Sequence, residues 1–213
     1  MASTTRRPSD AAHRRAELEK RILTVIEERL RDGVTYTELS VEQIAQAAGV
    51  SRSTFYLYFR DKVDVLLRLS GSLKIESSEI AASWKPTGAD GGVNGLARTY
   101  ELILRHYRKH AALLAAINEV AAYDSVVREA WTLDQERFIT NVMTTLEDEQ
   151  RAGRTPVDID PRLAATIIVQ GGGQVIAQQV ATTEGDDDGA VARELAQGYW
   201  HGIYRRPAGL DAD

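Results

Sequence analysis

The sequence contains no cysteine in 213 residues. This absence excludes disulfide bonds, thiolate metal sites and cysteine nucleophiles, and it favours a cytoplasmic protein. Long apolar runs are absent too, because the longest, Ala111–Ile117, has seven residues and a membrane helix needs about 20. The first fifteen residues hold four arginines and no apolar stretch, which argues against a secretory signal. We therefore expect no membrane partner.

Signatures of common catalytic and cofactor sites are also missing. There is no P-loop, GxGxxG or GxSxG, and no Lys-Ser/Thr pair follows Gly171–Gly173. His106 and His110 have the i, i+4 spacing of helical metal ligands, but no third ligand has a matching position, so surface histidines are the favoured interpretation. The acidic run Asp186–Asp188 lacks the EF-hand pattern, and we expect it to form a solvated loop. We expect no cofactor, no metal and no enzyme activity.

Charge is unevenly distributed along the chain. Residues 1–70 hold 12 basic and 10 acidic residues, a balance of +2, whereas residues 71–213 hold 14 and 21, a balance of −7. A small basic part followed by a larger acidic part indicates two regions with different functions. The total of −5 does not exclude a local DNA site, because only the cations that touch phosphates drive counterion release.

Apolar residues recur at helical spacing along almost the whole chain. No strand-like alternation with hairpin turns occurs, so the pattern predicts an all-α fold. Residues 1–15 are polar and basic, and we interpret them as a disordered arm. We expect four helices between Ala16 and about Trp84, and a glycine-rich loop, Pro86–Gly95, after them. Further helices are predicted at about 95–108, 111–122, 125–151, 161–182 and 190–204.

The stretch SVEQIAQAAGVSRSTFYLYFRDK, residues 40–62, carries the functional signal. Two short helices with the serine N-caps Ser40 and Ser51 meet at Gly49, where glycine permits the positive φ of a tight turn. Gln43 has the capping-box spacing from Ser40, and we expect Asp61 to cap the next helix. A helical projection places Phe55 and Phe59 on one packing face and leaves hydroxyls and tyrosines opposite. A bare helix–glycine–helix pair is often only structural, but here the caps, the glycine, the phenylalanine pair, a following lysine and the basic arm coincide. The combination predicts a helix-turn-helix whose second helix enters a major groove.

The run GVSRSTFYLYFRDKVDVLL resembles the DNA-binding signature of TetR/AcrR-family regulators, and TFYLYF is similar to the actinobacterial EthR-like branch. The resemblance covers about residues 16–70. It implies about nine helices: an N-terminal three-helix helix-turn-helix DNA-binding domain at 16–60, a C-terminal helical ligand-binding and dimerisation domain at 61–206, and a tail at 207–213. Carried over by position, the expected DNA-binding residues are Ser40, Arg52, Ser53, Thr54, Tyr56, Tyr58 and Lys62.

The side chains fit these roles. The match assigns contacts with DNA bases to Arg52, Ser53 and Tyr56, and an arginine can bind guanine O6 and N7 with two hydrogen bonds. It assigns contacts with DNA phosphates to Thr54, Tyr58 and Lys62, whose hydroxyl and ammonium groups can donate hydrogen bonds to phosphate oxygens.

The acidic part has no sharp motif. Trp131 and Phe138 are seven residues apart and share a helical face, where a core role and a cavity-lining role remain open. The family resemblance implies a pocket enclosed by helices five to eight, and an apolar lining favours a small, largely apolar effector. Gly171–Gly173 interrupts a helical pattern at about 1 kcal/mol per glycine, through either a close approach to the backbone or a local irregularity. Our candidate ligand-binding residues are Leu104, Ile117, Trp131, Phe138, Ile168 and Gly172.

The leading hypothesis is a homodimeric repressor that binds a palindromic operator in double-stranded DNA and is released by an apolar effector. The resemblance assigns dimerisation to the last two helices, where Gly198 and Gly202 would let a partner helix come close. A small helical enzyme is one alternative, although the chain offers no paired catalytic groups. An architectural or activator protein without a ligand is another, and it would contain no cavity.

Overall fold

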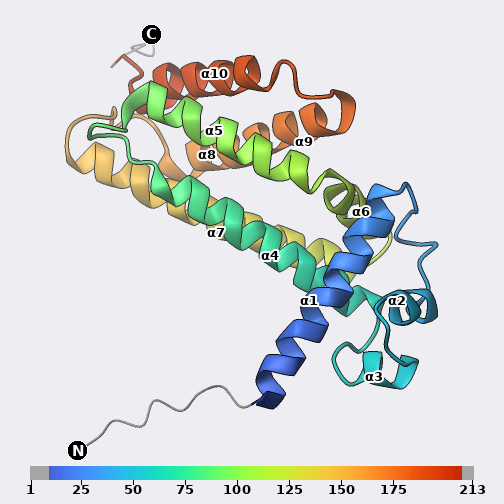
Figure 1. The fold of residues 1–213 in the computed structure, drawn as a ribbon. Coiled ribbons are helices and arrows are strands. Elements are labelled where there is room, and N and C mark those ends of the chain that lie inside the picture. Colours follow the sequence, from blue (N-terminus) through green and yellow to red (C-terminus); the bar gives the residue numbers. More distant parts are fainter. Residues whose placement is uncertain (1–9, 208–213) are drawn as a thin grey trace, which may run out of the picture.

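The computed structural model describes residues 10–207, with side chains from residue 16 onward, and contains no strand in that range (Figure 1). If α8, η1 and α9 are counted as one continuous helix and α10 with η2 as another, the described residues form nine helices, so the predicted fold class is confirmed. None of them is long and apolar enough to cross a membrane. In chain order they are α1 (Asp10–Arg31), α2 (Val41–Ala47), α3 (Arg52–Tyr56), α4 (Lys62–Ser83), α5 (Gly92–Lys109), α6 (Ala111–Ala121), α7 (Ser125–Arg151), α8 (Pro161–Thr166), η1 (Ile167–Gly171), α9 (Gly172–Thr182), α10 (Asp188–Tyr199) and η2 (Trp200–Tyr204).

Only part of the predicted basic arm lies within the described residues. Residues 1–9 and 208–213 lie outside the described residues. Asp10–Arg15, which we assigned to the arm, instead form the first turns of α1. This segment contains two alanines and two arginines, which favour helix, and no glycine or proline interrupts it.

Side-chain caps fix where several helices begin. Ser40 and Gln43 form the predicted capping box: Ser40 Oγ accepts from the Gln43 amide at 3.2 Å, and Gln43 Oε1 accepts from the Ser40 amide at 2.8 Å. Asp61 Oδ1 accepts from the Asp64 amide at 2.8 Å at the start of α4. These short-range hydrogen bonds satisfy amides that the first helical turn leaves without partners.

The helices α1 to α3 form a head at one end of the molecule, and the helices from α5 to η2 form a body (Figure 1). The long helix α4 begins in the head and runs along the body beside α7. Buried side chains of the head, such as Ile22 and Phe55, belong to the same apolar core as Leu66 of α4 and Ile117 of α6. The head is therefore packed onto the body through α4 and α6.

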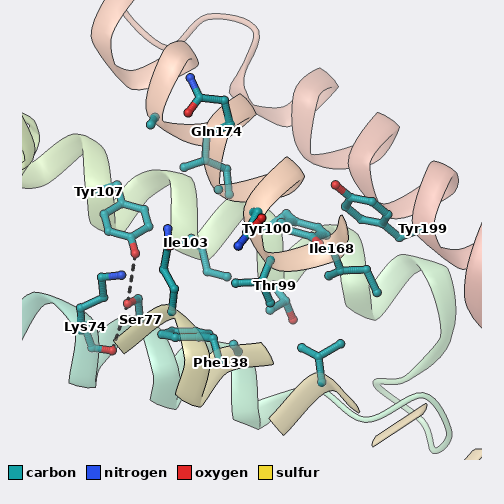
Figure 2. A pocket seen from close by; sticks show the side chains of 18 of the residues that line it. Lys74, Ser77, Thr99, Tyr100, Ile103, Tyr107, Phe138, Ile168, Gln174 and Tyr199 are labelled. Atoms are coloured by element: carbon teal, nitrogen blue, oxygen red, sulfur yellow. Dashed lines mark hydrogen bonds between the residues drawn. The ribbon is translucent and has the colours of Figure 1, made fainter. Parts of the chain in front are cut away.

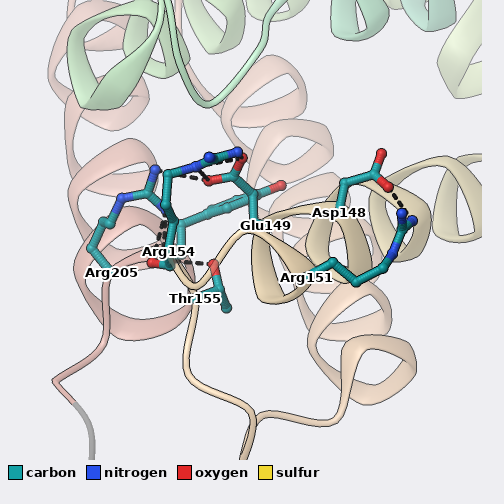
Figure 3. Close-up of polar contacts among 7 residues, drawn as sticks. Asp148, Glu149, Arg151, Arg154, Thr155 and Arg205 are labelled. Carbon is teal, nitrogen blue, oxygen red and sulfur yellow. Dashed lines mark hydrogen bonds and ion pairs between the residues drawn. The ribbon is translucent and has the colours of Figure 1, made fainter.

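A buried carboxylate fastens the end of α7 to η2 (Figure 3). Glu149 is 3% exposed and accepts hydrogen bonds from Arg154 at 2.6 Å and Arg205 at 2.8 Å. Burial by itself raises the pKa of Glu149, but the hydrogen bonds from Arg154 and Arg205 outweigh it and hold the pKa below its ordinary value. Thr155 adds a hydrogen bond from its hydroxyl to the Tyr204 carbonyl at 2.8 Å.

The acidic loop before α10 is not fully solvated, contrary to our expectation. Asp188 accepts two hydrogen bonds from Arg108 of α5, at 2.8 and 2.6 Å, and its side chain is only 20% exposed. Arg108 also donates to the Thr183 carbonyl at 2.6 Å. Arg108 thus holds the α9–α10 connection against α5. Because Arg108 and Asp188 are 80 residues apart, the local sequence does not reveal this contact.

Candidate DNA interface and ligand cavity

The head contains the turn that the sequence predicted. Gly49 has φ of +67°, and the Val50 amide donates to the Ala45 carbonyl at 2.9 Å across the turn. Ser51 caps α3 by accepting from the Thr54 amide at 3.0 Å. The α-helix ends at Tyr56 rather than at about Phe59, because the next two residues form a turn. The two elements α2 and α3 thus have helix-turn-helix geometry.

One face of α3 is packed and the other is open. Phe55 and Phe59 are at most 1% exposed, and their ring centroids lie 5.3 Å apart. Arg52, Ser53 and Tyr56 are exposed, as an interface with bases requires. The Arg52 guanidinium lies 5.6 Å from the centroid of the Tyr56 ring and donates to its hydroxyl at 3.4 Å. This contact fixes the two side chains next to each other on the open face.

The expected phosphate contacts are arranged less simply. Thr54 and Tyr58 are partly buried, and the Thr54 hydroxyl lies 2.8 Å from Ser51 Oγ. Lys62 donates its ammonium protons to three carbonyls of the connector before α2, those of Tyr36, Thr37 and Leu39, at 2.9 to 3.2 Å. The ammonium of Lys62 therefore holds the head together, a role that sequence reasoning missed.

The body encloses a cavity of about 660 Å³ (Figure 2). Residues of α4, α5, α6, α7, η1, α9, α10 and η2 line it, so the wall extends beyond the four helices that the resemblance implied. The described lining contains aromatic and aliphatic side chains, five amides, two small hydroxyls and four tyrosines. A cavity of this size and character fits a small-molecule ligand.

Three of our six candidate ligand residues line this cavity: Trp131, Phe138 and Ile168. Leu104 and Ile117 do not, because both are 0% exposed and packed inside the apolar cores. Gly172 does not either. A Cβ on this residue would lie 3.5 Å from the Tyr199 ring, so the position faces Tyr199. Equal helical spacing therefore did not distinguish the core from the cavity wall.

Both interpretations that the sequence left open for Gly171–Gly173, a close approach to the backbone and a local irregularity, apply in the structure. Residues Ile167–Gly171 form a π-helical turn, which is a local irregularity. A Cβ on Gly171 would lie 3.2 Å from the Tyr199 hydroxyl, so this glycine permits a close approach of α10. Gly173 is different, since it lines the cavity and no atom lies within 4 Å of its Cβ position.

Lys74 is the one charged side chain among the described residues that line the cavity. It is 7% exposed, and its ammonium lies 3.5 Å from the centroid of the Trp131 ring (Lys74 is labelled in Figure 2). Among the described residues it makes no ion pair, and the nearby Asp134 lies 3.5 Å from Arg137. Burial lowers the pKa of Lys74 from 10.5 to about 8, although the charge of Asp134 raises it.

Sequence reasoning missed Lys74, although a signal was available. Ser70, Lys74 and Ser77 recur at i, i+4 and i+7 on the buried face of α4, whose other buried residues are all valine or leucine. Polar residues at such positions mark either a satisfied core or a cavity. In this chain Lys74 and Ser77 face the cavity.

Comparisons with known proteins agree with this geometry. A model described as "Bacterial regulatory proteins, tetR family" matches residues 34–69, and one described as "Transcriptional regulator EthR, C-terminal domain" matches residues 96–204. The chain is 28% identical over 158 residues to the HTH-type transcriptional regulator EthR of Mycolicibacterium smegmatis, covering 73% of this chain and 72% of the relative. It is 27% identical over 148 residues to EthR of Mycobacterium tuberculosis, covering 69% and 68%.

Two solved structures illustrate the shared fold. One is a TetR-family transcriptional regulator from Mesorhizobium loti, with a TM-score of 0.70, 17% identity, and coverage of 90% of this chain and 98% of that one. The other is NalD of Pseudomonas aeruginosa, the secondary repressor of the MexAB-OprM multidrug efflux pump, with a TM-score of 0.69, 17% identity, and coverage of 91% and 100%. At these identities the likeness concerns the fold alone.

Proposed function

The chain belongs to the TetR family of bacterial regulatory proteins, with an EthR-type C-terminal domain, and from this premise we propose a repressor that a small, largely apolar molecule releases from DNA. The protein is a DNA-binding transcriptional regulator and not an enzyme. We retain the division into a DNA-binding domain at 16–60 and an effector and dimerisation domain at 61–206. A regulator of this kind is proposed to act in the cytoplasm.

The proposed DNA interface is the open face of α3. Arg52, Ser53 and Tyr56 are exposed there and would contact base edges in the major groove. Ser40, Thr54 and Tyr58 remain proposed contacts to phosphates, through hydroxyl groups at the start of α2, within α3 and just after α3. Lys62 also remains a proposed phosphate contact, in which the charge of its ammonium at the start of α4 attracts the DNA backbone.

The proposed dimer uses the last two helices. Leu163, Ile167 and Val175 are 63%, 58% and 42% exposed on the continuous helix from α8 to α9, an unusual amount of apolar surface for one helix. Gly198 and Gly202 have open space within 4 Å of their Cβ positions, as an approaching partner helix requires. A two-fold dimer would present two copies of α3 about 34 Å apart, one turn of DNA.

The proposed effector is a mainly apolar molecule with one negatively charged group. Aromatic and aliphatic side chains form most of the cavity wall, which favours an apolar body. Lys74 provides a buried positive charge, and the described lining contains no carboxylate to neutralise it. An anionic group on the effector would pair with Lys74 away from water, where such a contact is strong.

The observation that carries the switching proposal is the course of α4. Residues near its start pack in the head, and Lys74, Ser77 and Ala81 further along face the cavity. An effector that displaces these side chains would move α4 and change the distance between the two heads of a dimer. A preference of about 1–3 kcal/mol for the state that cannot bind DNA would weaken operator binding about 5- to 150-fold.

The test uses a fluorescent operator obtained by selection from randomised duplex DNA. Anisotropy at fixed salt would measure operator affinity with decanoate and with decan-1-ol, two probes of equal chain length that differ in charge. We expect decanoate to weaken operator binding, and by linkage operator DNA to weaken decanoate binding by the same factor in calorimetry. If the affinity for decanoate is equal with and without operator, a DNA-binding protein remains but effector-driven release is refuted.

A further inference from the structure

Two histidines that the sequence placed on the surface lie at a junction between head and body. His106 is on α5, and its side chain is only 8% exposed. His110 follows one helical turn later, between α5 and α6, and its side chain is 17% exposed. The ring centroids lie 5.2 Å apart. The expectation of surface histidines was therefore wrong, because α4 packs against α5 and Glu27 of α1 contacts His110.

The third ligand that the local sequence lacked comes from α4. Glu76 approaches the pair so that one oxygen of Glu76 and one nitrogen of each histidine all lie within 4.8 Å of one another. Glu76 Oε2 is 3.6 Å from His106 Nδ1. Two bonds of about 2.0–2.1 Å at a tetrahedral centre separate the ligand atoms by about 3.4 Å, so this spacing suits a shared ion.

The remaining nitrogen of each histidine already has a polar neighbour. His106 Nε2 lies 3.1 Å from the Leu73 carbonyl, which can only accept, so Nε2 is the donor and Nδ1 is the nitrogen that faces Glu76. On the other ring, His110 Nδ1 lies 3.4 Å from Glu27 Oε1 of α1, which leaves Nε2 for coordination. Metal-binding histidines commonly have such a carbonyl or carboxylate behind the ring, because it fixes the tautomer and orients the lone pair.

The geometry also leaves Glu76 accessible from solvent. Glu76 has a side chain that is 61% exposed, so it can adjust to an arriving ion from the solvent side.

We propose that Glu76, His106 and His110 bind a divalent transition-metal ion, with Zn²⁺ the best match. Two imidazoles and one carboxylate are typical ligands for zinc, and a water molecule would complete the four-coordinate shell. The site would connect α4 with α5, and through Glu27 with α1, where the head meets the body. It is separate from the effector cavity, whose described lining contains none of these residues.

The test uses the full-length protein without an affinity tag, after treatment with EDTA. Isothermal titration with ZnCl₂ is expected to give one ion per chain, and saturation at about 100 times the dissociation constant should raise the thermal midpoint by about 5–10 °C. Cobalt substitution should give the visible absorption of a tetrahedral centre. The substitution Glu76→Gln retains size on an exposed side chain, so folding is preserved, and it should weaken zinc binding at least tenfold.

Matched variants separate this site from others. His110→Gln should also weaken zinc binding at least tenfold, whereas His201→Gln, which changes an exposed histidine on η2, should leave it unchanged. The proposal is overturned if the wild-type protein binds no zinc, or if Glu76→Gln and His110→Gln bind it with wild-type affinity and thermal shift. Neither result affects the effector proposal, because the release of operator DNA by decanoate would be measured in the presence of EDTA.

Discussion

Replacement of Lys74 by methionine tests whether the charge in the cavity is stabilised by the protein itself. Methionine has a similar length and no charge, so it fills the same space beside Trp131. The reduction of the pKa from 10.5 to about 8 corresponds to about 3 kcal/mol against the charged amine. The cation–π contact with Trp131 offsets about 2 kcal/mol of this cost. We therefore expect Lys74→Met to raise the free energy of unfolding by about 1 kcal/mol.

The measurement is urea unfolding at pH 7 without ligand, followed by circular dichroism. The midpoint should rise while the dependence on urea stays the same, because the surface exposed on unfolding does not change. Lys20→Met is the control, since Lys20 is an exposed lysine on α1 and its replacement should change stability by less than about 0.5 kcal/mol.

The opposite outcome would refute the reasoning. If Lys74→Met lowers the free energy of unfolding by about 1 kcal/mol or more, the ammonium is already well compensated, by Asp134 and Trp131, and is not available for an anionic effector. The same variant should bind decanoate about 10- to 100-fold more weakly while its affinity for decan-1-ol changes little, a comparison that stability alone would not alter.

Four further predictions concern the head, the dimer and the buried carboxylate. Tyr56→Ala should lower specific operator affinity by about 1–3 kcal/mol with an unchanged melting curve, and equal anisotropy titrations would remove Tyr56 from the interface. Lys62→Met should lower the thermal midpoint, since three carbonyls lose their donor, and a stability equal to that of the wild type would contradict the structural role of the ammonium. Gly198→Leu should shift the sedimenting species from a dimer of about 47 kDa, twice 23.5 kDa, toward the monomer, and a variant that stays dimeric at nanomolar concentration would place this glycine outside the interface. Because the pKa of Glu149 is held low in the folded state, its contribution to stability should be present above the ordinary carboxyl pKa and lost as pH falls through the folded value, so urea midpoints of wild type and Glu149→Gln should converge in acid.

Features that depend on neighbours in the sequence could be predicted well. The turn at Gly49, the capping box of Ser40 and Gln43, and the N-cap at Asp61 all involve atoms at most five residues apart. Their chemistry is contained in a short window, so composition and spacing are sufficient. The packed face around α3 followed in the same way, because Phe55 and Phe59 are only four residues apart and their rings are in contact.

Features that depend on which segments pack together could not be predicted. Leu104 and Trp131 look equally suitable as cavity residues in the sequence, but only the assembly of the helices buries the first in a core and exposes the second to the cavity. The periodicity of a helix gives the direction of a side chain and not the object that it faces.

The polar contacts show the same division at longer range. The sequence by itself determined that the chain is helical, where its main helices run and which turn forms the helix-turn-helix. Only the tertiary structure decided that Lys62 donates to carbonyls 23 to 26 residues earlier, that Lys74 is the one charged side chain in the described cavity lining, and that Glu76 meets His106. Burial and charge pairing depend on distances between atoms in space, which one-dimensional spacing along separate helices does not contain.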